Sequence, residues 1–246
     1  DIACRLRGAE RLCRELESRL GPPLHGGSPA STPARVVDDN EARPAAVAWQ
    51  RSPCLGQCDA GSAALVLRAG PAAERFVVAP VADAEALLRA VREDPPDPVL
   101  RIVGGTGAAR LLARVGKTDP ASLDSYRAAG GYLALARAIA LGPEGVIAEV
   151  GASRLLGRGG AAFPTARKWD AVRRQAAMPH YVVCNADESE PGTFKDRVLL
   201  ERDPFAVIEA MTICGLATSG RHGFLYIRGE YPLAETRMRD AIVSAR

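Results

Sequence analysis

The sequence has little that would bind nucleic acid or cross a membrane. Aromatic residues make up only 5% of the 246 residues, and the net charge is +3 with the two signs well mixed. No basic stripe interleaved with aromatics, which nucleic-acid-binding domains typically show, is present. No apolar run approaches the roughly 18 residues that a membrane span needs. We therefore expect a globular protein with no nucleic-acid partner and no direct membrane span.

Cysteine is also scarce and unevenly spaced. The chain has six cysteines, of which only Cys54 and Cys58 form a close pair. This density is below that of a disulfide scaffold, so we expect a cytoplasmic protein that uses some of its cysteines as metal ligands. Cys13, Cys184 and Cys214 fall on buried faces or elements of the expected fold and are interpreted as structural. The three histidines have no partner at metal-ligand spacing.

A proline-rich segment, DPPDP at residues 94–98, divides the chain. Before it, an amphipathic helix at 8–20, strands at 64–68 and 75–79, and a helix capped by Asp83 predict a small helix-on-sheet domain. Residues 22–35 are predicted to form a loop or insertion, and residues 45–49 a strand. We place the first domain at residues 1–95 and a linker at 96–118.

The second domain, residues 119–246, alternates strands with helices. This alternation favours an α/β sheet. A first strand is expected near 99–103, ahead of this domain. Within the domain, a short buried strand is expected at 181–184 and a further strand at 223–229. Helices are expected at about 133–141, 144–156 and 204–218, and from 232 onward. For the helix at 204–218, Asp203 is the expected N-cap and Gly220 the expected stop.

A glycine-rich segment, Gly157 to Ala162, precedes an expected helix that begins at Pro164. Glycines without Cβ atoms allow a ring or a phosphate to approach the backbone, and a helix N-terminus favours an anion. The segment also fits the dinucleotide fingerprint G-x-G-x-x-G/A, but the residues before it look helical, which argues against a standard Rossmann unit. GGTGA at 104–108 is interpreted as a turn, and no GK[ST] follows the glycines to make a P-loop.

A second segment places three carboxylates, Asp187, Glu188 and Glu190, directly after an expected strand. Such a run is usually only a solvated loop. However, α/β sheets bind ligands at the carboxyl ends of their strands, and Pro191 and Gly192 hold this run in a turn. Carboxylates here could accept hydrogen bonds from ribose hydroxyls or a ring N–H. The segment is therefore a candidate binding loop.

Three segments carry a resemblance to a known family: GRGGAAFPTARKW at 157–169, CNADESEPGTFKDR at 184–197 and FLYIRGEY at 224–231. In this order they resemble the flavin-binding subunit of respiratory complex I and its relatives in NAD-dependent formate dehydrogenases and NAD-reducing hydrogenases. The resemblance covers roughly residues 119–246. It implies an α/β FMN-binding domain of the complex I flavoprotein type, which binds FMN and NAD(H).

The resemblance also implies roles for individual residues. Contacts to FMN or its phosphate are implied for Gly157, Arg158, Gly159, Gly160 and Lys168, and contacts to the flavin for Asn185, Asp187 and Glu188. Phe163 would stack on the adenine of NADH, and Glu190 would hold the nucleotide. Tyr226, Gly229 and Glu230 would lie around the flavin and the nicotinamide, with Glu230 as the candidate catalytic residue.

One position departs from the family. Ala162 stands where the family usually has glycine. The alanine adds a single methyl group, so cofactor binding is expected to survive unless the backbone there needs a positive φ.

The segment ACRLRGAERLCRELESRLG at 3–21 resembles the thioredoxin-like [2Fe–2S] subunit that partners the flavin subunit. The resemblance implies that Cys4, Cys54 and Cys58 are iron ligands in an N-terminal thioredoxin-like [2Fe–2S] domain, with a fourth ligand before Asp1. The distance along the chain between Cys4 and Cys54 is longer than the family leads us to expect, consistent with an inserted loop. The [4Fe–4S] cluster of the family is expected beyond Arg246.

The two domains in one chain resemble the diaphorase subunits of soluble NAD-linked enzymes. We therefore expect partners that are iron–sulfur subunits containing molybdenum, as in formate dehydrogenase, or nickel, as in NAD-reducing hydrogenase. Formate dehydrogenase is the leading hypothesis, with hydrogenase and complex I as alternatives. A non-catalytic assembly subunit would have lost the glycines or acidic residues. A stand-alone flavin reductase would not need the cysteine pair.

Overall fold

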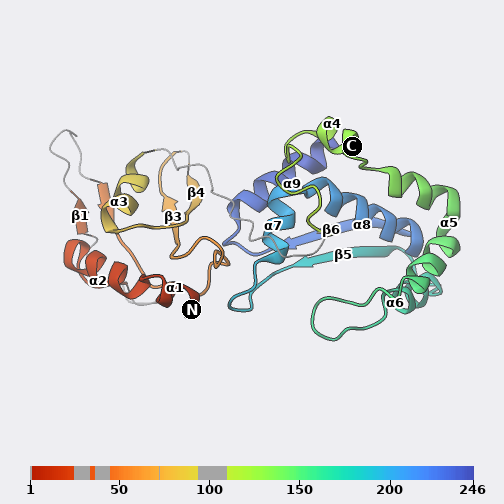
Figure 1. The fold of residues 1–246 in the computed structure, drawn as a ribbon, viewed down its shortest axis with the longest axis horizontal. Coiled ribbons are helices and arrows are strands. Elements are labelled where there is room, and N and C mark those ends of the chain that lie inside the picture. Colours follow the sequence, from red (N-terminus) through yellow and green to blue (C-terminus); the bar gives the residue numbers. More distant parts are fainter. Residues whose placement is uncertain (1, 25–33, 37–44, 72, 94–109) are drawn as a thin grey trace. The chain divides into compact units, whose positions relative to one another are not determined.

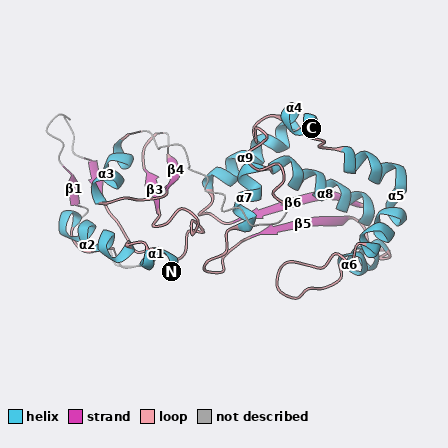
Figure 2. Cartoon of the chain, viewed as in Figure 1, coloured by secondary structure: helices cyan, strands magenta, loops and turns pink. Residues whose placement is uncertain are grey.

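The computed structural model describes residues 2–24, 34–36, 45–71, 73–93 and 110–246 (Figure 1). It is a mixed α/β chain, and helices precede, separate and follow the two described strands of its second half (Figure 2). Two compact units can be distinguished. Unit 1 consists of Asp1–Gly104, Ser189–Phe194 and Glu230–Pro232, and unit 2 of Gly105–Glu188, Lys195–Gly229 and Leu233–Arg246.

Unit 1 contains three helices and two antiparallel strand pairs within its described residues. The helices are α1 (Ile2–Leu6), α2 (Ala9–Leu20) and α3 (Ala84–Arg92), and the strand pairs are β1 (Ala34–Val36) with β2 (Ala45–Val47) and β3 (Ala64–Arg68) with β4 (Glu74–Val78). Asp83 caps α3 by accepting the N–H of Ala86 at 2.8 Å, as expected.

The core of unit 1 forms where helix faces meet the β3–β4 hairpin. Leu16 of α2 and Leu88 of α3 lie in one buried cluster with Val66 and Val78 of the hairpin. The expected helix-on-sheet packing is therefore present, whereas the thioredoxin-like identity of this domain stays a prediction. The expected strand near 99–103, the glycines at 104–108 and most of the 22–35 insertion lie outside the described residues.

Unit 2 is built around two parallel strands. Its elements in chain order are α4 (Leu123–Ala128), α5 (Leu133–Ala152), α6 (Thr165–Arg173), β5 (His180–Ala186), α7 (Lys195–Arg202), α8 (Pro204–Thr218), β6 (Gly220–Ile227) and α9 (Pro232–Ser244). Parallel strands need a crossover connection, which the helices α7 and α8 provide. Helix α8 packs against β5, β6 and α5. Within the described ranges, none of the helices combines the length and apolarity that a bilayer crossing requires.

The expectation of a short buried strand at 181–184 is wrong in two respects. Strand β5 runs from His180 to Ala186, and burial alternates along it. Val182 is buried, whereas Tyr181 and Val183 are 53% and 65% exposed. Successive side chains of a strand point to opposite faces, so one face of β5 lies toward α8 and the other is open among the described residues.

Helix boundaries also differ from those expected. The two helices expected at 133–141 and 144–156 form one element, α5, which is kinked where Gly142 takes a φ of 70° ahead of Pro143. It ends at Ala152, because Leu156 instead forms an antiparallel bridge with Pro164. Three short helices, α1, α4 and α7, were not predicted from the sequence.

Helix α8 begins at Pro204, as expected, but the predicted roles of Asp203 and Gly220 at its two ends are not observed. Asp203 gives no side-chain cap; its buried carboxylate accepts from Arg114 at 3.0 Å to Nε and 2.9 Å to Nη2. The predicted stop at Gly220 is also wrong. The left-handed residue that ends α8 is Ser219, with a φ of 60°, and Gly220 already begins β6.

A buried carboxylate on α8 fixes the start of α5. Glu209 accepts the hydroxyl of Tyr126 at 2.5 Å and the N–H groups of Tyr132 and Leu135 at 3.0 and 2.8 Å. Tyr132 is the left-handed N-cap of α5 and provides no side-chain cap of its own. Glu209 therefore satisfies N–H groups that the start of a helix would otherwise leave without acceptors.

Candidate functional site

The glycine loop, residues 157–163, joins the end of α5 to the start of α6 (Figure 1). Its base is closed by the Leu156–Pro164 bridge and by the N–H of Gly157, which donates to the carbonyl of Phe163 at 2.8 Å. All seven residues of the loop are exposed. The base is thus fixed, while the backbone between its two ends remains accessible to a ligand.

Two glycines of this loop, Gly159 and Gly160, have open space where a side chain would lie. A Cβ placed on Gly159 or Gly160 would meet no atom within 4 Å. Gly160 has a φ of +102°, a conformation that side chains rarely adopt. Close packing within the chain therefore does not explain these glycines, whereas close approach of a ligand to the backbone does.

Ala162 takes a left-handed conformation, with a φ of 51°. An alanine pays a steric penalty there that a glycine would not. The condition under which the alanine was expected to matter is therefore met. The loop adopts a conformation suited to glycine, and this chain adopts it with an alanine.

The glycine loop and the first turn of α6 contain basic residues. The first turn of α6 contains no acidic residue and includes the exposed Lys168, and Arg158 is exposed in the glycine loop. Phe163 is 50% exposed, and the guanidinium of Arg167 lies 5.8 Å from the centre of its ring. A helix N-terminus with nearby cations favours a phosphate, so this end of the loop suits the anionic part of a nucleotide.

The carboxyl ends of β5 and β6 bring two predicted residues together. Asn185 and Tyr226 are direct partners in the parallel register, and both side chains are exposed on the open face. The side-chain oxygen of Asn185 accepts the N–H of Asp187 at 3.1 Å, which turns the chain into the next segment. The pair offers hydrogen-bonding groups at the sheet edge where α/β proteins bind ligands.

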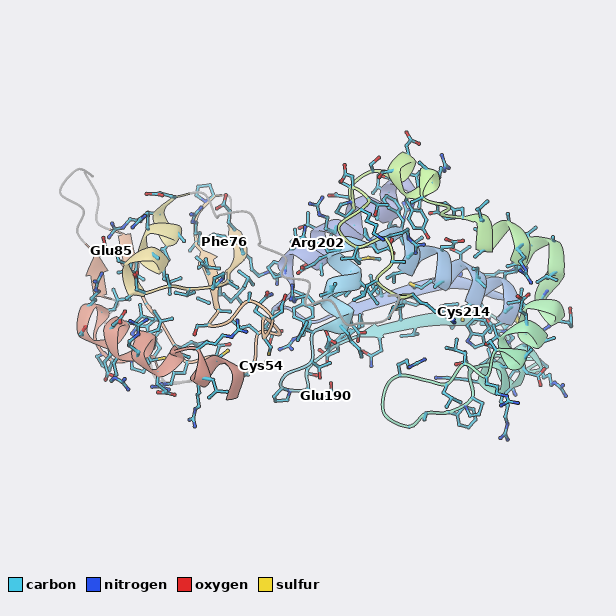
Figure 3. All side chains as sticks on the ribbon, in the orientation of Figure 1. Cys54, Phe76, Glu85, Glu190, Arg202 and Cys214 are labelled. Carbon is cyan, nitrogen blue, oxygen red and sulfur yellow. The ribbon has the colours of Figure 1, made fainter. Side chains whose placement is uncertain are left out.

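The acidic loop, residues 187–194, leaves β5 and leads into α7. Asp187 and Glu190 are exposed, and Figure 3 labels Glu190 on this loop. Glu188 differs, because it is only 2% exposed and its carboxylate faces the start of α7. Gly229 is exposed just after β6, and Glu230 beside it is half-buried. The structure therefore places the predicted acidic residues in different environments.

The predicted iron ligands are only partly brought together. Within unit 1, the sulfur atoms of Cys54 and Cys58 lie 4.0 Å apart, and the N–H of Gly56 points to the sulfur of Cys54 at 3.4 Å. Burial, followed by the charge and hydrogen bond of Cys54 and the charge of Cys4, raises the pKa of Cys58. Cys4 itself lies with its sulfur 3.8 Å from the carbonyl of Gly61.

Paired thiols with a backbone N–H on one sulfur are a donor set that fits an iron–sulfur cluster. However, no group of three or more His, Cys, Asp or Glu side chains is arranged to hold a metal ion in the part of the chain that the structure describes. Two of the predicted ligands therefore form a pair, and Cys4 is near enough to act electrostatically without completing a metal site.

Comparison with known proteins identifies the second half of the chain. Residues 150–246 match the family described as Nuo51 FMN-binding domain. This domain belongs to the NADH dehydrogenase flavoprotein family. A relative in Aquifex aeolicus, one of the subunits of its NADH-quinone oxidoreductase, is 47% identical over 146 residues, which are 59% of this chain and 34% of that protein.

A hydrogenase subunit shows a similar match to this flavoprotein domain. The NADP-reducing hydrogenase subunit HndC of Solidesulfovibrio fructosivorans is 48% identical over 131 residues, 53% of this chain and 26% of that protein. The chain thus spans about a third or less of the length of these relatives.

A solved structure extends the likeness to the whole chain. The NAD⁺-reducing [NiFe]-hydrogenase in its air-oxidized state aligns with a TM-score of 0.65 and 25% sequence identity, over 99% of this chain and 39% of that chain. The flavoprotein domain and the preceding unit 1 are therefore both represented in one chain of that hydrogenase structure.

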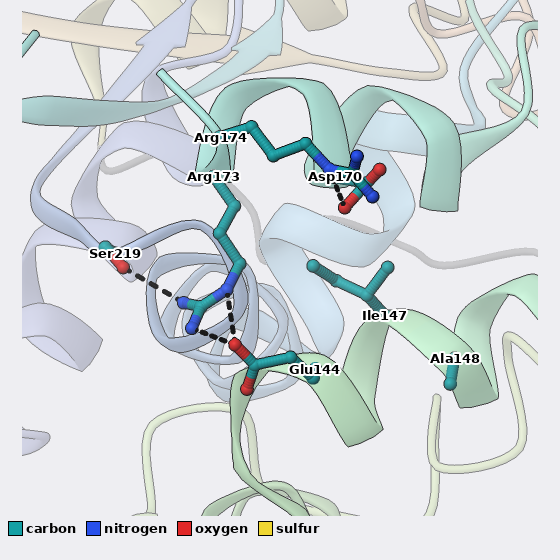
Figure 4. A pocket seen from close by; sticks show the side chains of 7 residues that line it. All are labelled: Glu144, Ile147, Ala148, Asp170, Arg173, Arg174 and Ser219. Carbon is teal, nitrogen blue, oxygen red and sulfur yellow. Dashed lines mark hydrogen bonds and ion pairs between the residues drawn. The ribbon is translucent and has the colours of Figure 1, made fainter. Parts of the chain in front are cut away.

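A cavity in unit 2 contains none of the predicted site residues. It measures about 630 Å³ and is lined by Glu144, Ile147, Ala148, Asp170, Arg173, Arg174 and Ser219 (Figure 4). Arg173 donates to Glu144 at 3.1 Å and to Ser219 at 3.2 Å, and Arg174 pairs with Asp170 at 2.9 Å. Because carboxylates already neutralise both guanidinium groups, the glycine loop is the better anion site.

Sequence reasoning missed Arg228, which is 9% exposed directly after β6. Its Nη1 donates to the main-chain carbonyl of Glu188 at 2.5 Å. A signal was available, because Arg228 is a charged residue at the carboxyl end of an otherwise largely apolar strand in the FLYIRGEY segment. Buried arginines need partners, and this one lies at the carboxyl end of β6, the edge of a sheet where α/β proteins commonly bind ligands.

Proposed function

We propose that this chain is the FMN- and NAD-binding subunit of an NADH-linked electron-transfer enzyme. One observation carries the proposal: an accessible glycine loop followed by a cation-flanked helix start, in a domain that matches the Nuo51 FMN-binding domain. The chemistry that bound FMN would supply is acceptance of a hydride from the nicotinamide and release of the electrons one at a time. The chain's own residues bind and orient the two nucleotides.

The proposed roles follow the geometry of the two loops. The start of α6, with Arg158 and Lys168, binds the FMN phosphate, and the glycine loop allows the close approach of the flavin. The pair at the sheet edge, Asn185 and Tyr226, orients the flavin by hydrogen bonds. Gly229 gives close access beside Tyr226, because it lacks a Cβ.

The nicotinamide nucleotide is assigned to more exposed groups. Phe163 presents half of its ring surface to solvent and can stack on the adenine. The exposed carboxylate of Glu190 accepts hydrogen bonds from the ribose, and Glu230 is placed near the reacting rings as the candidate catalytic residue. Asp187, exposed at the start of the acidic loop, contacts the flavin.

We assign Cys54 and Cys58 to a [2Fe–2S] cluster, with Cys4 and a ligand preceding Asp1 as the remaining pair. The 4.0 Å separation of the first two sulfur atoms supports this assignment. Closing the set requires Cys4 to move from its position beside Gly61. A [4Fe–4S] cluster is assigned to residues following Arg246. None of the six cysteines, all of which lie in the described residues, forms a disulfide, and this fits a cytoplasmic setting.

The partner is a multi-subunit oxidoreductase. A likeness to the NAD⁺-reducing [NiFe]-hydrogenase that extends over 99% of this chain favours a hydrogenase-type assembly. The leading sequence hypothesis, NAD-dependent formate dehydrogenase, remains the second candidate because its diaphorase subunits share the same fused arrangement. Metal analysis of the co-purified complex separates them: nickel supports hydrogenase, and molybdenum or tungsten supports formate dehydrogenase.

A cofactor inventory of the purified full-length protein tests the function itself. Acid-released flavin is identified by mass, and iron and sulfide are counted beside it. FMN together with iron supports electron transfer. Iron without flavin overturns the glycine-loop assignment, whereas flavin with iron for only one [4Fe–4S] cluster overturns the assignment of Cys4, Cys54 and Cys58.

The nucleotide assignment has its own test. Glu190→Gln removes the charge of an exposed acceptor, so the KM for NADH should rise by about tenfold while FMN stays bound. An unchanged KM would remove Glu190 from the nucleotide site.

A further inference from the structure

The carboxylate of Glu188 is fully engaged inside the protein. It accepts the N–H of Asp196 at 3.0 and 3.1 Å and the N–H of Arg197 at 3.1 Å. The ammonium group of Lys195 lies 3.7 Å from it. These are the first residues of α7, so Glu188 caps a helix that begins seven residues further along the chain.

This cap closes the acidic loop at its base. The main chain leaves unit 2 after Glu188 and returns to it at Lys195. Because the Glu188 side chain bonds to the second and third residues of α7, the two ends of the segment 189–194 are joined by hydrogen bonds within unit 2. The segment is therefore held at both ends, independently of its own conformation.

Arg228 fixes the same point from the neighbouring strand. It follows the last residue of β6 and donates to the main-chain carbonyl of Glu188 at 2.5 Å. The carboxyl ends of β5 and β6 are thus linked through this carbonyl as well as through the strand register. Glu188 and Arg228 are both more than nine-tenths buried. Solvent therefore does not weaken these contacts as it weakens exposed ion pairs.

From these contacts we infer that Glu188 and Arg228 are positioning residues, which hold the acidic loop so that Glu190 meets the nicotinamide nucleotide. Glu188 acts as the helix cap that closes the loop, and Arg228 holds the carbonyl from which the loop departs. This inference rests on the proposed function. It replaces the flavin contact that the family resemblance implied for Glu188, because its carboxylate is occupied at α7.

Glu188→Gln provides the first test. An amide oxygen can replace one acceptor oxygen, but its NH₂ group faces the N–H donors of α7. In hydrogen exchange of the full-length protein, the amides of Asp196 and Arg197 should exchange about tenfold faster. The KM for NADH should rise by about tenfold with kcat changed less than about threefold, and bound FMN should be unchanged.

Arg228→Met and Arg228→Lys provide the second test. Methionine removes the donor, whereas lysine keeps a charge and a donor on a side chain of different geometry. The KM for NADH should rise most in Arg228→Met and be partly rescued in Arg228→Lys. The matched controls are Glu149→Gln and Arg137→Lys, which alter an exposed ion pair on α5 and should leave KM, FMN content and exchange unchanged.

Two results would overturn the inference. Loss of FMN from Glu188→Gln with unchanged exchange at Asp196 and Arg197 would make Glu188 a flavin ligand. Faster exchange with an unchanged KM would show that closing the loop does not set the nucleotide site. If the wild-type protein carries no FMN and oxidises no NADH, the proposed function fails, and the exchange rates still support or overturn the closure by Glu188.

Discussion

Asn185 and Tyr226 face each other across the parallel strands β5 and β6, with both side chains exposed on the open face of the sheet. They are 41 positions apart in the sequence and belong to different motifs. The register of the sheet therefore brings two segments together at one candidate binding edge. Because the side-chain oxygen of Asn185 accepts from Asp187, the amide nitrogen supplies donors for a ligand.

Asn185→Ala should weaken FMN binding by about tenfold, which corresponds to the loss of about 1.4 kcal/mol of hydrogen bonding. Titration of the deflavinated protein with FMN gives the dissociation constant. His222→Ala is the control, because His222 lies on the same face at the other end of β6, opposite Tyr181. Equal effects of the two substitutions would argue against a specific role for Asn185.

Ala162→Gly should stabilise the glycine loop. Ala162 has a φ of 51°, and a left-handed alanine costs about 1 kcal/mol or more. Glycine removes this cost, but its greater freedom in the unfolded chain offsets part of the gain. We expect a net gain of up to about 1 kcal/mol in the free energy of unfolding, with FMN bound at least as tightly. Urea unfolding measures the first quantity and FMN titration the second.

The neighbouring Ala161 provides the matched control. It is exposed in the same loop but is not among the residues with a positive φ. Ala161→Gly should therefore lower the free energy of unfolding by about 0.5–1 kcal/mol, because glycine only adds freedom to the unfolded chain. If both glycine variants shift stability in the same direction, the left-handed conformation of Ala162 is not the cause.

Glu209→Gln should be the most destabilising of these single substitutions. Three donors converge on its buried carboxylate, from Tyr126, Tyr132 and Leu135, and an amide cannot accept from all of them. We expect a loss of about 2 kcal/mol in the free energy of unfolding, measured by urea denaturation. Glu149→Gln, at an exposed pair on α5, should change it by less than about 0.5 kcal/mol.

Alkaline pH should destabilise the protein through Tyr126. Burial, together with the hydrogen bond to Glu209 and its negative charge, raises the pKa of Tyr126 above its ordinary value of 10.0. A raised pKa means that the protonated hydroxyl is favoured in the folded state. Its contribution is complete below about pH 10, the unfolded value, and is lost as the pH rises toward the folded value.

Unfolding free energies measured between about pH 9 and 11 check this prediction. Tyr126→Phe removes the titrating hydroxyl, so it should lose stability at pH 9 and decline less steeply than the wild type above pH 10. Parallel declines in the two proteins would show that other groups, such as Tyr132, whose pKa is also raised by burial, govern the alkaline limb.

Much of the candidate site could be read from the sequence, because its signals are local. Glycines at 157, 159 and 160 followed by Pro164 indicate a loop before a helix start, whichever fold surrounds them. The acidic run ending in Pro191 and Gly192 likewise indicates a turn after a strand. The preferences for loop, turn and strand come from residues only a few positions apart, so they can be recognised without the fold.

The role of Glu188 could not be read in this way. In the sequence it is one of three neighbouring carboxylates, and nothing local separates it from the exposed Asp187 and Glu190. Only the return of the chain at α7 buries it and provides the N–H groups of Asp196 and Arg197. The helix α7 itself was missed because its charged, weakly amphipathic sequence depends on this distant cap.

The sequence by itself determined β5, β6, α6, α8 and α9 approximately and marked the two candidate binding loops, because backbone preferences and hydrophobic periodicity act over a few residues. The family of the second domain followed from the resemblance of three motifs. Only the tertiary structure decided that Asn185 pairs with Tyr226, that Glu209 caps α5, and that Arg228 holds the carbonyl of Glu188. Each of these joins residues distant in the chain, and strand register and burial, which bring such residues together, are properties of the folded chain.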